Sequence, residues 1–329
     1  MLKGFQNIFK IPELRRRVLF TLGMIVVVRF GAFLPTPGVD GVALNAFIQK
    51  FFSQSSAGGL LSFINLFSGG AMTKATIFAL GIMPYITASI IIQLLTAVVP
   101  ALEKLAREGE SGRRKIVEYT RFFTVILCMF QAFMLSLWLE NPSNFGNNII
   151  VRHPGWFFRI TTVLTLTTGT VFLMWLGEQI TEKGIGNGIS LIITVNILSR
   201  LPRAIAIGWA TMGPNGSQPK HPFFIILMFV IFLLVIAGVI MLTQGQRKIP
   251  VQYAKRFVGR KVYSGQASYI PFRVNYAGVI PIIFASSILL FPATIASMVK
   301  NEFLQAIAGA LYPGTMLYIL AYTTMIIFL

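Results

Sequence analysis

The stretch Gly81–Leu95, which reads GIMPYITASIIIQLL, combines two properties that rarely occur in one helix. It is apolar enough to enter a bilayer, yet it contains four helix-breaking or polar residues: Pro84, Thr87, Ser89 and Gln93. At membrane depth, broken and polar helices are tolerated only where protein covers them or where they line a cavity. The stretch therefore predicts a membrane helix that faces other helices or an internal passage.

The rest of the chain has the composition of a membrane protein. Hydrophobic residues make up 55% of the 329 positions and charged residues only 12%. Helices of about 20 apolar residues cross a hydrocarbon core. Eight segments approach or reach that length: 18–35, 75–99, 122–139, 160–177, 187–202, 223–242, 274–296 and 313–329. We expect an all-α polytopic membrane protein, and because the last run reaches Leu329 without a polar end, we expect a piece of a longer chain.

The charge of the chain predicts its orientation. Its 28 lysine and arginine residues outnumber 10 acidic residues, which gives a net charge of +18. The basic residues concentrate before the first segment, between the second and third, and in the loop 244–275. Because cytosolic loops carry an excess of lysine and arginine, we expect the N-terminus and these loops in the cytosol.

The loop 244–275 is patterned as well as basic. The runs KIPVQYA and SYIPFRV are β-like and are separated by a basic segment with glycines, which predicts a projecting hairpin. One interpretation is a topology anchor that touches anionic lipid. The other is a docking arm for a polyanionic or acidic cytosolic partner, because lysine and arginine beside aromatic residues suit phosphate backbones.

Motifs of catalysis are missing from the sequence. There is no H-E-x-x-H, G-x-S-x-G or Walker loop, and GIGNG at 184–188 resembles a nucleotide loop only in its glycines. His153 and His221 have no cysteine or carboxylate neighbours that would complete a metal site. We expect neither an enzyme nor a bound cofactor or metal.

An ion-coupled secondary transporter of the inverted-repeat type is the alternative function. Such transporters hold charged residues near the membrane midplane, whereas the segments here are almost free of them. Arg29 is the main exception. We expect it to snorkel to the interface or to bond a carbonyl near the outer end of the first segment.

Three segments place isoleucines and polar residues on one helix face beside a glycine or proline. These sets are Ile82, Ile86, Ser89 and Gln93; Ile189, Ile193 and Asn196; and Pro281, Ile283, Ser286 and Ser287. Isoleucines at i and i+4 are commonly helix–helix packing. The recurrence of the whole pattern in three helices favours the lining of a passage instead.

Long motifs in this order resemble the SecY family of protein-conducting channels. They are FLPTPGVD, FSGGAMTKATIFALGIMP, EGESGRRK, GTVFLMWLGEQITEKGIGNGIS, YAKR and RVNYAGVIPIIFASSILLFPATIAS, together with the opening stretch. The resemblance implies a SecY-type channel of two inverted five-helix halves, with the second half truncated here at about eight spans. It divides the chain into residues 1–202, with spans one to five, and residues 203–329, with spans six to eight and the cytosolic loop 244–275.

The resemblance also assigns roles to residues. The family's pore ring falls on Ile82, Ile86, Ile189, Ile193 and Ile283. Its plug falls on about 60–70, with Leu60, Leu61, Phe63, Ile64, Leu66 and Phe67. Candidate lateral-gate residues are Thr87, Gln93, Asn275, Ser286 and Ser287. Candidate docking residues for the ribosome or motor are Arg247, Lys248, Lys255, Arg256, Arg260 and Lys261.

The partners and location implied are those of the family. They are the SecE and SecG subunits, the SecA motor, translating ribosomes with their RNA and proteins, signal sequences and nascent chains, and anionic lipid. The location is the bacterial cytoplasmic membrane, where the channel passes secretory proteins across and membrane proteins sideways into lipid.

Overall fold

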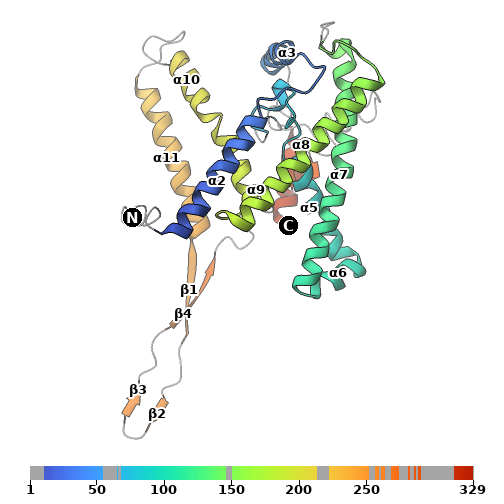
Figure 1. Ribbon diagram of the computed structural model, residues 1–329. Coiled ribbons are helices and arrows are strands. Elements are labelled where there is room, and N and C mark those ends of the chain that lie inside the picture. The colour runs from blue at the N-terminus through green and yellow to red at the C-terminus, as the bar shows by residue number, and fades with distance from the viewer. Residues whose placement is uncertain are drawn as a thin grey trace. The chain divides into compact units, whose positions relative to one another are not determined.

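The computed structural model describes most of the chain in two compact units. The residues it describes are 11–54, 65, 68–145, 150–212, 222–251, 256–258, 261–263, 268–273, 281, 285–286, 288–289 and 315–328. The first unit comprises Met1–Pro202 and Phe284–Phe328, and the second comprises Arg203–Ile283 with Leu329. Helices dominate both, which confirms the predicted all-α class (Figure 1).

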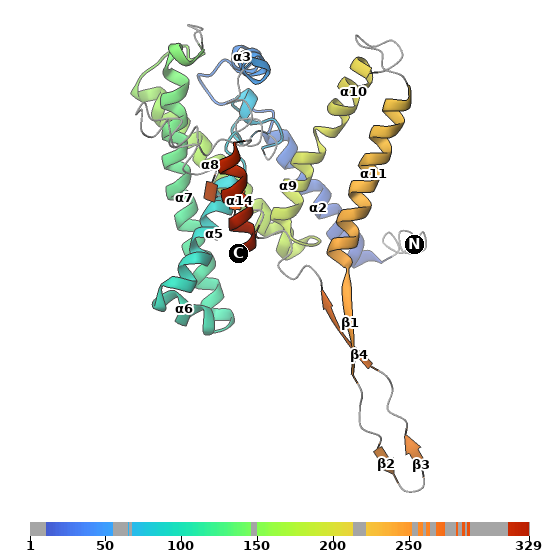
Figure 2. The same cartoon turned by 180° about the vertical axis from the view of Figure 1, so that it is seen from behind.

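The first unit contains eight α-helices among its described residues. They are α2 (Pro12–Gly31), α3 (Gly41–Gln54), α5 (Met83–Val98), α6 (Pro100–Arg107), α7 (Glu110–Glu140), α8 (Trp156–Lys183), α9 (Gly188–Leu198) and α14 (Met316–Phe328). Two short 3-10 helices, η1 (Met72–Lys74) and η2 (Pro142–Phe145), lie between them. Figure 2, seen from behind, shows α14 leading to the C-terminus.

The helices match the predicted segments closely, apart from 274–296, most of which lies outside the described residues. Four described stretches are long and apolar enough to cross a membrane alone: Glu110–Glu140, Trp156–Lys183, Gly188–Ala210 and Ile226–Gln244. A fifth is the bent pair Met83–Thr96 and Pro100–Arg107, whose axes differ by 97°. The fold is therefore that of a multi-pass membrane protein.

The second segment begins later than its predicted start at residue 75, because η1 and a series of turns occupy 72–82. The helix starts at Met83, with Pro84 in its first turn. Proline suits that position because its missing N–H would have no helical partner there. The helix ends before Pro100, since the residue preceding a proline disfavours helical geometry. Sequence-encoded prolines thus define both ends of α5.

Two apolar clusters form the core of the first unit. One, which we call the α7–α8 cluster, is centred on Phe145, whose ring packs edge-on against Phe47 and Trp138 at centroid distances of 5.0 and 4.7 Å. The other, the α8–α9 cluster, consists of Val28, Ala32, Ala71, Phe78, Ile82, Leu173, Leu176, Ile180 and Ile192. The second cluster contains residues of α2, α8, α9 and the turns before α5, so two of the three predicted lining segments meet there.

The second unit consists of two helices and a long hairpin. Most of α10 (Leu201–Met212) belongs to it, together with α11 (Pro222–Gln244). Strand β1 (Gln246–Val251) pairs antiparallel with β4 (Ser268–Arg273), and β2 (Arg256–Val258) pairs with β3 (Lys261–Tyr263). This pairing confirms the hairpin predicted from the two β-like runs. It projects from the end of α11 (Figure 1).

Candidate functional site

The four described isoleucines of the predicted ring gather at the α8–α9 cluster. Ile82 belongs to the cluster itself and is 1% exposed. Ile86, Ile189 and Ile193 are partly buried and pack against the cluster. The fifth, Ile283, lies outside the described residues. Residues more than a hundred positions apart in sequence thus meet around one apolar centre, and large apolar side chains at a constriction exclude water and ions.

Close contact between α8 and α9 holds Ile189 in this position. A Cβ atom added to Gly188 would lie 2.0 Å from the carbonyl oxygen of Gly177, so only glycine permits the observed approach of the two backbones. A Cβ atom on Gly177 would in turn lie 3.0 Å from Cγ1 of Ile189. The last glycine of GIGNG, Gly188, therefore serves helix packing.

Most of the isoleucines on the predicted lining face are less buried than two isoleucines off that face on the same helices. Ile90 and Ile192, which lie off that face, are 4% and 1% exposed. Ile86, Ile189 and Ile193 retain more exposure, whereas Ile82 does not. Three of the four described ring candidates are therefore partly exposed, and Ile82 is buried.

The lateral-gate candidates are only partly described, since Asn275 and Ser287 lie outside the described residues. Thr87 is 8% exposed on α5, and Gln93 is exposed farther along the same helix, so the two do not form one polar patch. Ser286 is partly buried and has an interaction partner.

The plug candidates Leu60, Leu61, Phe63, Ile64, Leu66 and Phe67 all lie outside the described residues. The end of the predicted plug segment is described, however. Gly70 N–H donates to the Asn65 carbonyl oxygen at 3.1 Å, and Ser68 packs 3.5 Å from the position of a Cβ on Gly81. Because Gly81 directly precedes Ile82, this turn lies next to the start of the lining helix.

The docking candidates Arg247 and Lys248 lie exposed on β1, where they pair in register with Phe272 and Pro271. The Lys248 ammonium lies 4.6 Å from the centre of the Tyr269 ring. Arg256 and Lys261 belong to β2 and β3, and Lys255 and Arg260 lie outside the described residues. The hairpin therefore carries cations beside an aromatic ring, the combination that suits phosphate or acidic partners.

Sequence reasoning missed the hydrogen bonds that α2 makes. Arg29 bonds a carbonyl, but that carbonyl belongs to a side chain of another helix: its Nη1 donates to Oδ1 of Asn196 at 3.3 Å. The Thr21 hydroxyl oxygen accepts from the backbone N–H of Ile185 at 3.2 Å. Arg29 was the one residue whose type indicated a bond from this segment to another, because a cation within a membrane segment needs an acceptor. No feature of the sequence indicated the bond that Thr21 makes.

Two ion pairs tie the long helices together. Nε of Arg121 on α7 lies 2.8 Å from Oε1 of Glu178 on α8. Glu140 at the end of α7 accepts from Arg159 at 2.7 Å and from the backbone N–H of Gly155 at 2.9 Å. Because each pair joins different helices or a helix and a loop, they fix helix spacing and offer no reactive group.

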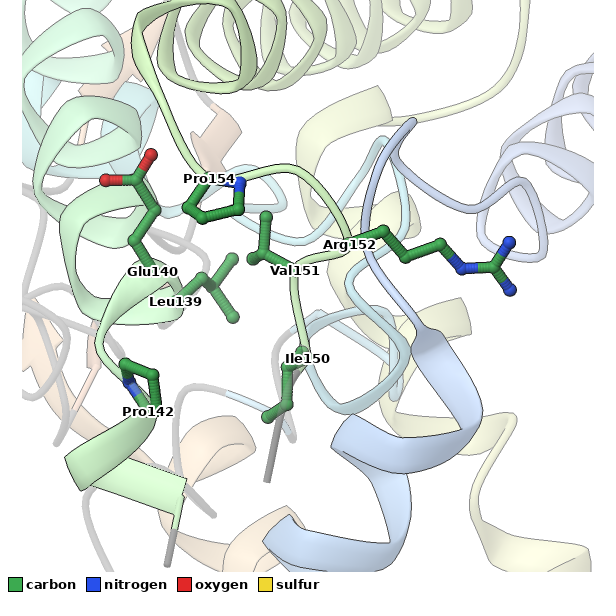
Figure 3. A pocket seen from close by; sticks show the side chains of 7 residues that line it. All are labelled: Leu139, Glu140, Pro142, Ile150, Val151, Arg152 and Pro154. Carbon is green, nitrogen blue, oxygen red and sulfur yellow. The ribbon is translucent and has the colours of Figure 1, made fainter. Parts of the chain in front are cut away.

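A cavity of about 230 Å³ lies beside Glu140 (Figure 3). Most of its lining is apolar, and it consists of Leu139, Glu140, Pro142, Ile150, Val151, Arg152 and Pro154. The Arg152 side chain points away from the others, and both Glu140 oxygens already accept hydrogen bonds. The cavity therefore has no polar group poised for a ligand. Within the described ranges, no cluster of His, Cys, Asp or Glu could hold a metal ion.

Sequence comparisons give one consistent result. The family model SecY matches residues 76–329. Protein translocase subunit SecY of Buchnera aphidicola subsp. Acyrthosiphon kondoi is 48% identical over 320 residues, which cover 96% of this chain and 87% of that protein. The subunit of the same name from Escherichia coli K12 is also 48% identical over 320 residues, covering 96% of this chain and 70% of that one.

Structural comparisons show a related fold. The chain aligns with a solved protein-conducting channel at a TM-score of 0.56 and 17% identity, and with a SecY protein studied for its plug domain at 0.54 and 20%. A channel from a canine ribosome–channel complex of the endoplasmic reticulum gives 0.52 and 17%. Each alignment covers 92% of this chain and 60% of the other, so the chain spans about three fifths of the length of these channels.

Proposed function

The chain belongs to the SecY family of protein translocase subunits, and from this we propose that it forms the pore of a protein-conducting channel. In this role it passes secretory proteins across the bacterial cytoplasmic membrane and membrane proteins sideways into lipid. The observation that carries the proposal is the convergence of Ile82, Ile86, Ile189 and Ile193 on the α8–α9 cluster. The relatives are translocase subunits, which favours a channel and gives no support to an ion-coupled transporter.

In the proposed channel, the isoleucines form a gasket at the narrowest point. Branched apolar side chains close around a moving polypeptide without binding it, because they offer no hydrogen bonds, and they keep water and ions out. Ile283 completes the ring, and the segment 60–67 covers it as a plug. Thr87, Gln93, Asn275, Ser286 and Ser287 form the gate toward lipid. Hydrogen bonds between membrane helices average about 0.6 kcal/mol, which is weak enough for reversible opening.

The proposed partners act on the cytosolic side. The chain carries no ATPase motif, so the driving force comes from the SecA motor or a translating ribosome, both docking on the basic hairpin. SecE and SecG complete the membrane complex, and anionic lipid contacts the basic loops. The N-terminus is cytosolic under the charge rule that places basic loops inside.

The pore assignment is tested by crosslinking to a secretory chain stalled in the full-length, assembled translocase. Single cysteines replace Ile82, Ile86, Ile189 and Ile193 in turn, and a cysteine in the stalled chain reports contact. We expect strong crosslinks at these four sites, because a translocating chain cannot avoid the narrowest point.

Two matched controls lie on the same helices. Ile90→Cys and Ile192→Cys place the thiol off the predicted lining face, and native Cys128 lies buried on α7. All three should crosslink weakly. Crosslinks at Ile90→Cys and Ile192→Cys as strong as those at the ring sites would mean that the isoleucines are ordinary packing residues.

A further inference from the structure

The first helix contacts the fifth predicted span at two points that bracket the ring isoleucines. Thr21 of α2 accepts from the N–H of Ile185, just before α9, and Arg29 of α2 donates to Asn196, near the end of α9. Thr21 and Arg29 lie about 12 Å apart along their helix, since each residue adds about 1.5 Å. Ile189 and Ile193 lie between the two contacts in sequence.

Each contact joins one buried side chain to a less buried partner, since Ile185 is exposed and Arg29 is partly buried. Thr21 is 6% exposed and Asn196 is 3% exposed, and Val28 of α2 lies in the α8–α9 cluster at 2% exposure. In partly buried surroundings a hydrogen bond is stronger than in water, so the loss of either bond weakens the attachment of α9 to α2. The two hydrogen bonds therefore resist displacement of α9 along or away from α2.

The beginning of α9 is fixed independently of α2. Oδ1 of Asn187 accepts from the N–H of Ser190 at 3.2 Å and caps the helix. The N–H of Gly188 donates to the Thr181 hydroxyl of α8 at 2.9 Å. Because these bonds already hold the start of α9 to α8, the hydrogen bond to Thr21 attaches α2 to a fixed part of the structure.

The turn Ser68–Gly70 packs against the contact between Arg29 and Asn196. Gly69 has φ +65°, and a Cβ atom on it would lie 2.9 Å from Nη1 of Arg29 and 3.1 Å from Oδ1 of Asn196. The turn therefore packs directly on the Arg29–Asn196 pair. Because the packing is close, a displacement of either side chain would shift the turn. The turn in return limits the space into which the Arg29 and Asn196 side chains could move.

We propose that α2 is a brace, in which Thr21 and Arg29 are positioning residues that determine how α9 presents Ile189 and Ile193 to the pore. The inference rests on the proposed channel function. It predicts that loss of either hydrogen bond shifts α9 and loosens the closed ring, although neither residue belongs to the ring.

The test uses the full-length channel, assembled with its partner subunits in planar bilayers. Thr21→Val removes the hydroxyl at constant shape, and Asn196→Leu removes the acceptor. We expect each to raise resting ion conductance about threefold, the shift that one hydrogen bond of average strength between membrane helices produces. Arg29→Met combined with Asn196→Leu should leak no more than Asn196→Leu alone, because both changes remove the same bond and the double variant leaves no cation without its acceptor. Thr21→Val with Asn196→Leu should leak more than either.

Two further variants separate the brace from general damage to α9. Arg29→Lys keeps a cationic donor for Asn196 and should leak less than Asn196→Leu. Thr194→Val is the matched control, because Thr194 is exposed and its hydroxyl donates to the Ser190 carbonyl within α9. It should not leak.

A second readout follows the position of α9 directly. In the crosslinking assay, the ratio of yield at Ile193→Cys to yield at Ile192→Cys should fall about threefold in the Thr21→Val background. Unchanged conductance and ratio in Thr21→Val and Asn196→Leu, or equal leak in Thr194→Val, would overturn the brace. Ile82→Asn serves as the positive control. If this variant also fails to raise resting conductance, the pore assignment itself is wrong. If it raises conductance while the brace variants do not, only the brace proposal is wrong.

Discussion

At the scale of single residues, the meeting of α8 and α9 depends on Gly188. A methyl group there would lie 2.0 Å from a backbone carbonyl oxygen, so the helices must separate to admit it. Overpacking of this kind costs about 1–3 kcal/mol. We expect Gly188→Ala to lower the midpoint of thermal unfolding in detergent and to raise resting conductance.

Gly238→Ala is the matched control for Gly188→Ala. A Cβ atom on Gly238 meets nothing within 4 Å on α11, and alanine favours helix more than glycine does. This variant should be as stable as the parent or more so. An equal loss of stability in both variants would show that the contact of Gly188 with Gly177 is unimportant.

At the scale of elements, the basic hairpin predicts salt-dependent docking. Exchanging Arg247, Lys255, Arg256 and Arg260 for glutamate should weaken binding of ribosomes and SecA, because cations on the hairpin face phosphates or carboxylates. For ribosomal RNA, the slope of log affinity against log salt should fall by roughly 0.7–0.9 for each lost phosphate contact. Binding is measured by cosedimentation with membranes over a series of salt concentrations.

The control for the hairpin keeps its charge. Arg247→Lys with Lys248→Arg leaves the number of cations unchanged on the exposed face of β1, so affinity and salt slope should stay close to those of the parent. Unaltered binding of both partners by the glutamate variant at low salt would instead favour a topology anchor on anionic lipid.

At the scale of the whole molecule, we predict that closure of the channel depends on the predicted plug segment before the turn Ser68–Gly70. Deleting Leu60–Phe67 removes no predicted span, so insertion and folding should persist while resting conductance in planar bilayers rises. A shortened channel as tight as the parent would show that the segment is not a stopper. The same deletion combined with Thr21→Val should leak more than the deletion alone, because the brace acts on the ring.

The sequence by itself determined the membrane class, most helix positions and the family. These follow from local signals: long apolar runs, basic loops, prolines at both ends of α5 and long family motifs. It also placed Ile86, Ile189 and Ile193 on helix faces, since spacing alone decides which residues share a face, whereas Ile82 lies at the cap position just before α5.

Only the tertiary structure decided which faces meet. The approach of Gly188 to Gly177, the bond from Arg29 to Asn196 and the contact of Thr21 with Ile185 join residues distant in sequence. No periodicity encodes such pairs, because a threonine that bonds its own helix and one that bonds another look the same in sequence. The physical reason is that hydrogen bonds and close backbone contacts depend on three-dimensional position, whereas helix formation and membrane partitioning depend on local composition.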